Sequence, residues 1–244
     1  MHAIVIAGGK GTRLGPLTAK SPKALMRFGD RSLLEITLLQ MRRAGATRIT
    51  LCVSHLSHLI EREFGNGQRL GLRIDYCHDP GRLGTAGPLR HVSDWNSPAL
   101  VVNCDILTSL DFGRLHRAHC ESGRVLTIAT KRRDITVPFG VLEVTDQGAV
   151  QSISEKPTLS FDVSAGIYVV NAEVRSRISA DGPMDMPLLV QTLLENGSSV
   201  GASPFTARWH DIGTPDSYQT AQNEYLADPR AFLAPEYVAA MAER

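Results

Sequence analysis

The feature that most constrains this chain is an apolar segment that runs directly into a glycine-rich loop near the N-terminus. Residues His2–Ala7 form the apolar segment, and Gly8, Gly9 and Gly11 follow it. A short apolar run bounded by glycines is typical of a buried strand in a parallel sheet, which needs helices on both of its faces. Glycines also let the backbone approach a polyphosphate closely and direct N–H groups at its oxygens. The segment therefore predicts an α/β fold with a phosphate-binding loop.

Three basic residues, Lys10, Arg13 and Lys23, lie in or just after this loop. Arginine can hold a phosphate through two parallel hydrogen bonds, whereas lysine acts as a point charge. The loop is not a Walker loop, because Gly11 is followed by Thr12 and Arg13 instead of Lys and Ser or Thr, and it lacks the glycine spacing of the Rossmann fingerprint. It predicts a different kind of phosphate site. The alternative is a glycine-rich turn that binds nothing.

Short apolar runs alternate with helix-length segments in the first 130 residues, which favours βαβ units. We expect strands at 2–7, 48–53, 73–77, 99–102 and 125–130, and helices at 32–44, 55–64, 85–92 and 112–120. The pattern then changes to a hairpin at 139–144 and 150–155, strands at 163–170, 200–204 and 205–210, and helices at 188–195 and 214–227. The predicted fold class is a doubly wound, mostly parallel, Rossmann-like mixed sheet flanked by helices, with a smaller antiparallel part.

Length and charge restrict the class of protein further. A chain of 244 residues can form one large α/β domain, and its net charge of +1 provides no basic field for a nucleic acid or a membrane surface. The four cysteines contain no Cys-x-x-Cys pair, so neither a disulfide framework nor a zinc site is expected. The N-terminal apolar run is too short for a signal peptide or a membrane span. We therefore expect a cytoplasmic protein without nucleic-acid or membrane partners.

Two carboxylates in the later sequence are candidate metal ligands. Asp105 follows the apolar run 99–102, and a carboxylate at the carboxyl end of a parallel strand faces the ligand crevice of an open α/β sheet. Asp211 precedes a glycine turn and a predicted helix that Thr214 would cap. Carboxylate oxygens suit a Mg²⁺ ion that is shared with phosphates. The simpler alternatives are that Asp105 caps the next segment and that Asp211 only organises its turn.

The order of the motifs resembles that of the sugar-1-phosphate nucleotidyltransferases, also called nucleotide-sugar pyrophosphorylases. The matching strings are A-G-G-x-G-T-R-L at 7–14 with Pro22-Lys23, L-G-T-A-G-P-L at 83–89, N-C-D at 103–105, P-F-G at 138–140, E-K-P at 155–157, S-A-G-I-Y at 164–168 and W-x-D-I-G-T-P-x-x-Y at 209–218. Cys104 stands where the family usually has Gly, and Ser164 stands where it usually has Asn. The pattern is most similar to bacterial guanylyltransferases for mannose, heptose or amino-sugar 1-phosphates.

The resemblance implies one domain at 1–227, with a nucleotide-binding half at 1–130 and a sugar-binding half at 131–227, followed by a tail at 228–244. Arg13 and Lys23 are expected to be catalytic, and Asp105 and Asp211 to hold Mg²⁺. The implied nucleotide-binding residues are Ala7, Gly8, Gly9, Gly11, Thr12, Arg13, Gly84, Thr85, Gly87 and Asn103. The implied sugar-phosphate-binding residues are Gly140, Glu155, Lys156, Ser164 and Gly166.

The implied reaction is attack of a sugar 1-phosphate oxygen on the α-phosphorus of a nucleoside triphosphate, with pyrophosphate leaving. It needs no protein nucleophile, so catalysis depends on positioning and on neutralisation of charge. GTP is the favoured nucleotide, and the sugar is of the mannose, heptose or amino-hexose type. The alternatives are a UTP-, dTTP-, CTP- or ATP-dependent transfer, a cytidylyltransferase for an alcohol phosphate or phosphonate, and an idle nucleotide-sugar-binding regulator. A homodimer is left open.

Overall fold

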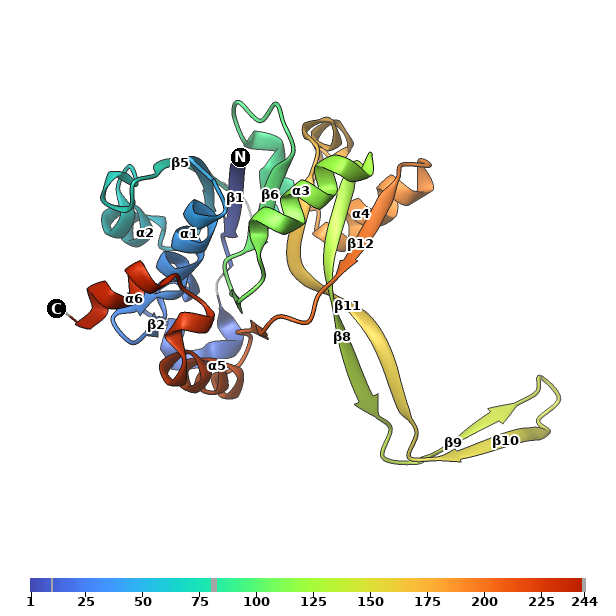
Figure 1. Cartoon of the computed structure of the whole chain (residues 1–244). Helices are drawn as coiled ribbons and strands as arrows, with labels where there is room; N and C mark the ends of the chain where they lie inside the picture. The colour runs from blue at the N-terminus through green and yellow to red at the C-terminus, as the bar shows by residue number, and fades with distance from the viewer. Residues whose placement is uncertain (10, 80–82, 243–244) are drawn as a thin grey trace.

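A seven-stranded mixed sheet forms the centre of the protein (Figure 1), whose computed structural model describes residues 1–9, 11–79 and 83–242. The strand order is β12-β8-β11-β6-β1-β4-β5. These strands are β1 (His2–Ala7), β4 (Arg48–Val53), β5 (Arg73–His78), β6 (Ala99–Asn103), β8 (Leu126–Thr136), β11 (Thr158–Val170) and β12 (Val200–Pro204). Strand β11 is antiparallel to β6 and β8, and the other pairs are parallel. The predicted mostly parallel mixed sheet is therefore confirmed.

Helices and irregular segments cover both faces of the sheet, and each face has its own apolar core. Alternate β1 residues contribute to the two cores: Ala3 and Val5 face one, and Ile4 and Ile6 face the other. The first core includes α1 (Leu33–Arg43), α2 (Ser57–Phe64), α3 (Phe112–Ser122) and α5 (Pro215–Ala227), and the second includes α4 (Met186–Glu195), η4 (Gly87–His91) and η5 (Ala172–Arg177). Because both faces of β1 are covered, its entire apolar run is buried, as the sequence predicts.

The remaining elements are short. They are the 3₁₀ helices η1 (Thr12–Thr18), η2 (Lys23–Leu25), η3 (Gln68–Leu70) and η6 (Pro229–Ala231), the strands β2 (Arg27–Phe28), β3 (Arg31–Ser32), β7 (Ile106–Thr108), β9 (Gly140–Val144), β10 (Val150–Glu155) and β13 (Trp209–Asp211), and the helix α6 (Pro235–Ala242). The strand predicted at 205–210 is wrong in position, because residues 205–208 form no strand and β13 begins at Trp209 to pair with β7. The helix predicted at 85–92 is the shorter 3₁₀ helix η4.

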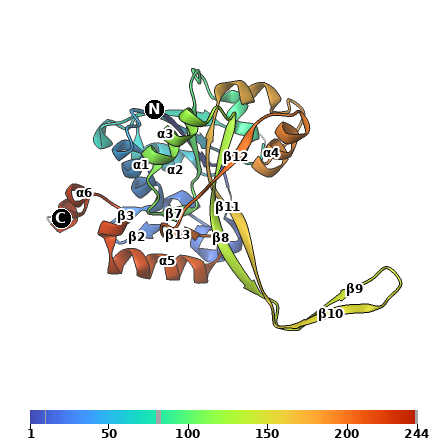
Figure 2. The same cartoon turned by 45° about the vertical axis from the view of Figure 1, so that its right-hand side comes forward.

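Strands β8 and β11 are longer than the sequence predicts, and their extensions leave the sheet as a two-stranded ribbon. Beyond Thr130, where β12 stops pairing with β8, the ribbon continues to Thr136 opposite Thr158. It then bends into the β9–β10 hairpin, which the sequence predicts at nearly the same residues. We call residues 134–162 the arm and the rest of the chain the body. Figures 1 and 2 show from two directions that the arm projects away from the body.

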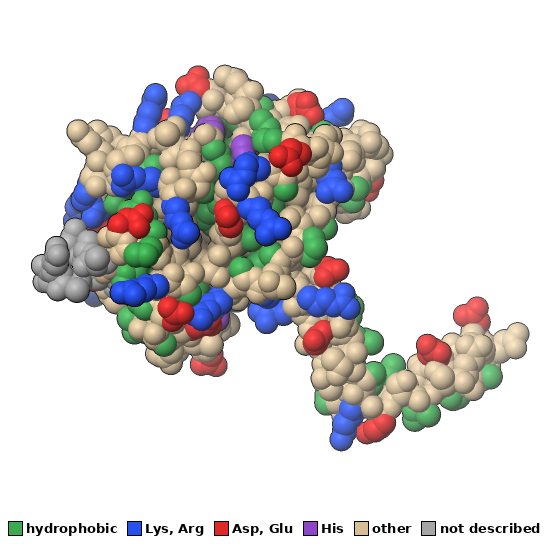
Figure 3. All heavy atoms as spheres, in the orientation of Figure 1, with side chains coloured by type: hydrophobic (Ala, Val, Ile, Leu, Met, Phe, Trp, Pro, Cys, Tyr) green, Lys and Arg blue, Asp and Glu red, His purple; other side chains and the backbone are tan. Residues whose placement is uncertain are grey.

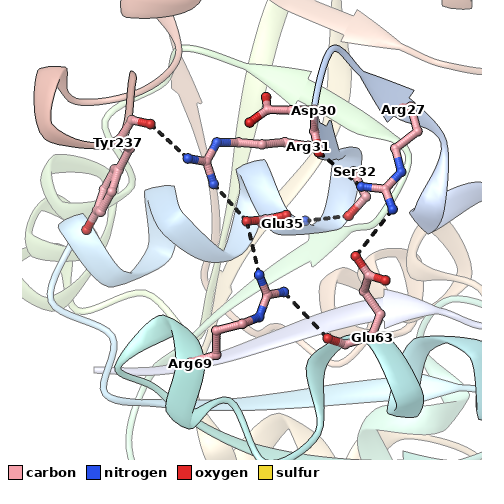
Figure 4. A network of polar contacts seen from close by, with 8 residues as sticks. All are labelled: Arg27, Asp30, Arg31, Ser32, Glu35, Glu63, Arg69 and Tyr237. Atoms are coloured by element: carbon pink, nitrogen blue, oxygen red, sulfur yellow. Dashed lines mark hydrogen bonds and ion pairs between the residues drawn. The ribbon is translucent and has the colours of Figure 1, made fainter. Parts of the chain in front are cut away.

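The segment after α5 packs against the body. Phe232, Leu233 and Ala234 are buried, and the first two belong to the same apolar core as α1. The Arg31 guanidinium donates one hydrogen bond to Glu35 Oε1 at 2.7 Å and another to the Tyr237 carbonyl at 2.8 Å (Figure 4). Arg31 therefore links α6 to the first turn of α1, through a buried ion pair with Glu35 and a hydrogen bond to a backbone carbonyl of α6. Among the helices of the described residues, none combines the length and the apolar character that crossing a membrane requires.

Candidate active site

The carboxyl ends of β1 and β6 form the crevice in which this site lies. Strand β1 pairs with β4 on one side and with β6 on the other, so the order of the strands reverses there. In open α/β sheets, ligands bind outside the carboxyl ends of the strands at such a switch point. The glycine loop leaves β1 at this place, and the Cys104 N–H donates to the Ile6 carbonyl at 3.0 Å, which fixes Asp105 beside the loop.

The glycine loop is shaped by its glycines and closed by Thr18. Gly11 has φ +64°, a left-handed conformation, and a Cβ there would lie 3.0 Å from Thr18 Cγ2. The Gly11 carbonyl accepts hydrogen bonds from the Leu14 N–H at 2.9 Å and the Thr18 hydroxyl at 2.8 Å. A Cβ at Gly9 would meet open space. The loop therefore presents bare backbone to the crevice; Lys10 lies outside the described residues.

Lys23 and Asp105 form a short ion pair at the bottom of the crevice. Lys23 Nζ donates to Asp105 Oδ2 at 2.7 Å, and Lys23 is only 6% exposed. Pro22 is extended and opens the 3₁₀ turn η2, which directs Lys23 inward. A buried ammonium requires a partner of opposite charge, and Asp105 supplies it. The pair places a fixed positive charge beside a partly exposed carboxylate.

Asp211 reaches the same place through β13. In the β13–β7 pair Asp211 is opposite Ile106, and the Ile212 N–H donates to the Asp105 carbonyl at 2.9 Å. Burial raises the pKa of Asp211, the negative charge of Asp105 raises it further, and the charges of Lys23 and Arg13 oppose the shift. Two carboxylates that are far apart in sequence therefore lie close enough for the charge of one to act on the other.

Two adjoining cavities meet at Asp105. The first, of about 240 Å³, is lined by Ile6, Gly9, Gly11, Thr12, Arg13, Lys23, Thr85, Asn103, Cys104, Asp105 and Gly213. The second, of about 400 Å³, is lined by Arg13, Thr85, Asn103, Asp105, Ile106, Ser164, Ala165, Gly166, Tyr168, Asp185, Met186, Pro187, Trp209 and Asp211. Four residues line both cavities: Arg13, Thr85, Asn103 and Asp105. The geometry therefore offers two neighbouring compartments with a charged boundary between them.

The second cavity depends on a close approach between β6 and β11. Gly166 has φ +71°, and a Cβ there would lie 2.9 Å from Asn103 Nδ2, so only glycine fits against this amide. Asn103 Oδ1 is buried and has no hydrogen-bond partner among the described residues. Leaving such an atom unsatisfied costs about 1–3 kcal/mol. Because Asn103 lines both cavities, its unsatisfied oxygen is a position at which a ligand would be stabilised.

The segment around Thr85 forms a wall of both cavities by packing against α4. The Asp185 carboxylate accepts from the Thr85 N–H at 2.9 Å, and the Thr85 hydroxyl accepts from the Met186 N–H at 2.8 Å. Gly84 and Gly87 do not line either cavity; a Cβ at Gly84 would lie 2.6 Å from the Met184 carbonyl oxygen. Asp185 was not predicted as a site residue. Its signal is the Asp-Met-Pro sequence at the start of α4, where Asp185 holds the N-cap position but makes no capping hydrogen bond, so that its carboxylate is free to bind Thr85.

The structure brings together most, but not all, of the expected site residues. Ala7 and Gly8 lie at the end of β1 and do not line the cavities. Gly140, Glu155 and Lys156 lie on the exposed arm, outside both cavities and away from the body (Figure 1). The expected sugar-phosphate residues are thus divided, because Ser164 and Gly166 line the second cavity while the other three are on the arm.

The chemistry of the site follows from its oxygen donors. No group of three or more His, Cys, Asp or Glu side chains that could hold a metal occurs within residues 1–9, 11–79 and 83–242. Asp105 and Asp211 still fit Mg²⁺, which is commonly held by one or two carboxylates together with phosphates and water. Cys104 lines the first cavity, but burial raises the pKa of its thiol to about 12. It is therefore a poor candidate for a nucleophile.

The structure is thus an α/β protein with a polar, charged crevice at the switch point of its sheet, and sequence comparison supplies its family. The family model "Nucleotidyl transferase" matches residues 2–228, so the chain belongs to this family. It is 30% identical over 242 residues to the mannose-1-phosphate guanylyltransferase catalytic subunit beta of Drosophila melanogaster, covering 96% of this chain and 65% of that one. It is 32% identical over 240 residues to a UTP–glucose-1-phosphate uridylyltransferase of Synechocystis, covering 90% and 62%.

The chain thus spans about two thirds of the length of these two relatives. Its fold is similar to that of HddC from Yersinia pseudotuberculosis, solved in complex with GMP-PN. The TM-score is 0.71 at 20% identity, and the match covers 92% of this chain and 99% of that one. The family resemblance and the fold class that the sequence predicts are confirmed.

Proposed function

We propose that this chain transfers a nucleoside monophosphate from a nucleoside triphosphate to a sugar 1-phosphate and releases pyrophosphate. The observation that carries the proposal is the position of Asp105 on the boundary between two cavities, with Lys23 Nζ at 2.7 Å. A triphosphate in the first cavity and a sugar phosphate in the second would meet at this boundary. Direct transfer between two substrates requires such a meeting point, with the reacting atoms close and aligned.

In this proposal the body residues act by position and charge. The backbone of Gly9, Gly11 and Thr12 and the Arg13 guanidinium, all of which line the first cavity, hold the β- and γ-phosphates. Lys23 stabilises the charge that develops at the α-phosphorus, and its bond to Asp105 holds the ammonium in place before the reaction. Ser164 and Gly166 line the sugar side. In the proposed reaction the sugar phosphate oxygen is itself the nucleophile, so no covalent intermediate on the protein is required, and the Cys104 thiol, whose pKa burial raises to about 12, is poorly suited to form one.

Asp105 and Asp211 hold the Mg²⁺ ion in the proposed enzyme. When bound, the ion supplies neutralisation and polarisation of phosphate oxygens. The raised pKa of Asp211 fits this role, since two neighbouring carboxylates gain most from a shared cation. Lys23 contacts one side of the Asp105 carboxylate, and the Asp105 side chain remains 28% exposed, so it is still accessible to a metal ion.

GTP is the proposed nucleotide, and a mannose, heptose or amino-hexose 1-phosphate is the proposed acceptor. The name of the Drosophila relative supports guanylyl transfer to mannose 1-phosphate, whereas the name of the Synechocystis relative keeps a uridylyl transfer open. The Thr85 hydroxyl is engaged with α4, so backbone groups of Gly9 and the Thr85 segment carry most of the base recognition in this proposal. A cytoplasmic setting, where nucleoside triphosphates are available, belongs to the same proposal.

The test is a matrix of GTP, UTP, dTTP, CTP and ATP against mannose, heptose, amino-hexose and glucose 1-phosphates, scored by pyrophosphate release. GTP should exceed ATP by at least about tenfold in kcat/KM, because a mismatched base leaves buried polar groups unpaired. A pyrimidine triphosphate as the best substrate would overturn the guanine assignment and leave the transfer reaction standing. Nucleotide binding without turnover for any pair would favour the alternative of a nucleotide-sugar-binding regulator.

A further inference from the structure

We propose that the arm docks on the body of a second copy of this chain and delivers Lys156 and Glu155 to the second cavity of that copy. The docking is argued from the apolar surface of the arm and from the opposite net charges of the arm and the body, and it does not depend on the proposed function. The delivery rests on the proposed function, because it assigns the sugar phosphate as the group that Lys156 meets. Each part is tested below by its own measurement.

The first argument is the apolar surface of the arm. Most exposed large apolar side chains of the described residues lie on it: Ile135, Phe139, Val141, Leu142, Val144, Val150, Ile153, Leu159 and Phe161. Phe139 is 71% exposed and Ile153 is 68% exposed. Figure 3 shows apolar side chains, coloured green, along the projecting arm. A two-stranded ribbon with both faces in water is marginally stable at best, and a concentration of exposed apolar side chains marks an interaction site.

The second argument is the amount of surface available for a symmetric contact. Covering nine such side chains on each of two arms would remove on the order of 1,500 Å² of accessible surface, which is the size of a stable protein–protein interface. In a two-fold dimer each arm would make the same contact with the other body, so the contacts close without leaving a free arm.

The third argument is charge. The arm has five acidic residues, Asp134, Glu143, Asp146, Glu155 and Asp162, against one basic residue, Lys156, so its net charge is −4. Because the whole chain carries +1, the body carries +5. An acidic arm and a basic body of the same chain are complementary, which favours their encounter and orients it.

The arm of one copy cannot reach its own cavities while the ribbon stays paired. The β8–β11 ladder continues from Lys131 opposite Val163 to Thr136 opposite Thr158. Six residues of paired strand extend roughly 20 Å at about 3.4 Å per residue. Folding back would break these pairs, and Figures 1 and 2 both show the hairpin directed away from the body. The body of a second copy is therefore the partner that keeps the ladder intact.

The fourth argument is the geometry at the bend of the arm. Lys156 has φ +46°, and its N–H donates to the Phe139 carbonyl at 3.2 Å where the ribbon turns into the hairpin. A left-handed conformation costs a residue with a side chain about 1–2 kcal/mol, and strain of this kind concentrates at functional sites. The Lys156 side chain is 65% exposed, and its ammonium lies 3.9 Å from Glu155 Oε1. Its charge is thus presented to solvent at the bend.

The fifth argument is the charge balance of the second cavity. Asp105, Asp185 and Asp211 line it, and among its described lining residues Arg13 is the one cationic side chain. Arg13 also lines the first cavity, where the proposed triphosphate needs it. A sugar 1-phosphate entering beside three carboxylates needs a further cation. Lys156 of a docked arm supplies that cation, and Glu155 beside it offers an acceptor for sugar hydroxyls.

The docking is tested by molar mass in solution. The wild-type chain should be a dimer, and the Phe139→Ser/Ile153→Ser double variant should shift to a monomer in light scattering coupled to size exclusion. Both side chains are exposed, so the substitutions should leave the body folded. Leu188→Ser/Leu194→Ser is the matched control, since these two exposed leucines lie on α4 and should leave the dimer intact. A monomeric wild type, or a dimer that the arm variant leaves unchanged, would overturn the docking.

The delivery is tested with mixed dimers purified through two different tags after co-expression. In a dimer of Asp105→Ala with Lys156→Ala, one body is intact and its partner's arm is intact. The rate is measured with the sugar 1-phosphate well below its KM, where the loss of Lys156 lowers turnover; delivery between copies then predicts about half of the wild-type pyrophosphate release, because one of the two sites is complete. If each arm served its own body, the mixed dimer would not exceed the two parent variants, and the delivery would be overturned. Asp105→Ala with Lys23→Ala is the control, because both bodies are then defective and neither arrangement restores activity.

The two measurements separate the failure of this inference from the failure of the proposed function. A wild-type protein that binds nucleotide but transfers it to no sugar phosphate would overturn the proposed function and, with it, the delivery. The molar mass of the Phe139→Ser/Ile153→Ser variant would still decide the docking. Turnover by the wild type without recovery in the mixed dimer would overturn the delivery alone.

Discussion

The body and the arm present site residues in opposite physical settings. In the body, Lys23 begins the turn η2, Asp105 lies between β6 and β7, and Asp211 ends β13; a 2.7 Å ion pair joins Lys23 to Asp105, and a 2.9 Å hydrogen bond joins the residue after Asp211 to the Asp105 carbonyl. On the arm, every residue of β9 and β10 is exposed. The difference shows that buried strands place the body residues with little freedom, whereas the position of Lys156 in a working enzyme depends on what the arm contacts.

The largest expected effect is in the body. Asp105→Ala and Asp211→Ala should each abolish turnover, because either change removes half of the carboxylate pair that is proposed to hold Mg²⁺. Asp216→Ala in the first turn of α5 is the matched control and should keep activity. Pyrophosphate release is the measurement, with circular dichroism to show that the fold persists. Chelation of divalent cations should have the same effect and be reversed by Mg²⁺; near wild-type rates in either variant would rule out the two-carboxylate site.

Lys23→Ala should lower kcat by about 10²–10³-fold and change the KM for the nucleotide much less, because a preorganised charge acts mainly in the transition state. Lys20→Ala, an exposed lysine three residues earlier, should be nearly neutral. Steady-state kinetics with the preferred nucleotide measure both constants. An increase in KM with kcat unchanged would instead make Lys23 an anchor for the bound triphosphate.

The corresponding change on the arm should have a different kinetic signature. Lys156→Ala should raise the KM for the sugar 1-phosphate by about tenfold and leave the KM for the nucleotide unchanged, since a charged contact is worth about 1.5–3 kcal/mol at most and this one is partly exposed. Arg132→Ala, an exposed basic residue on the stem that leads to the arm, is the control. Equal increases in the KM values for the nucleotide and for the sugar 1-phosphate would contradict the proposal that the arm acts on the sugar phosphate only.

The smallest expected effect is on stability. Because burial and Asp105 raise the pKa of Asp211, the folded chain binds this proton more tightly than the unfolded chain does. The carboxylate therefore lowers stability increasingly as the pH rises from about 4 through its raised folded pKa. Asp211→Asn should raise the Tm at pH 7 by about 1–2 °C, and the gain should shrink toward pH 4. A lower Tm at pH 7 would show that the carboxylate is well compensated in the folded state.

The sequence predicts the body better than the arm for a physical reason. Strands 2–7 and 48–53 are buried on both faces, so their apolar runs reveal them, and the residues that follow such strands can be placed in a crevice. The extension of β8 runs through Lys131, Arg132, Arg133 and Asp134, and no apolar pattern marks a ribbon whose two faces are both solvated. The turn at 145–148 predicts the hairpin, but nothing in the sequence predicts how far from the body the hairpin lies. Asp185 was missed because its role lies in a contact with Thr85, far away in sequence.

The most direct test of the central claim is whether pyrophosphate leaves before the sugar phosphate arrives. The protein is incubated with Mg²⁺ and a triphosphate labelled at the α-phosphorus, with and without the sugar 1-phosphate, and label is followed on protein and on product. Direct transfer across the boundary at Asp105 predicts no pyrophosphate and no labelled protein without the acceptor, then equal amounts of pyrophosphate and labelled nucleotide sugar once it is added. Pyrophosphate release with stoichiometric label on the protein in the absence of the sugar phosphate would contradict the account.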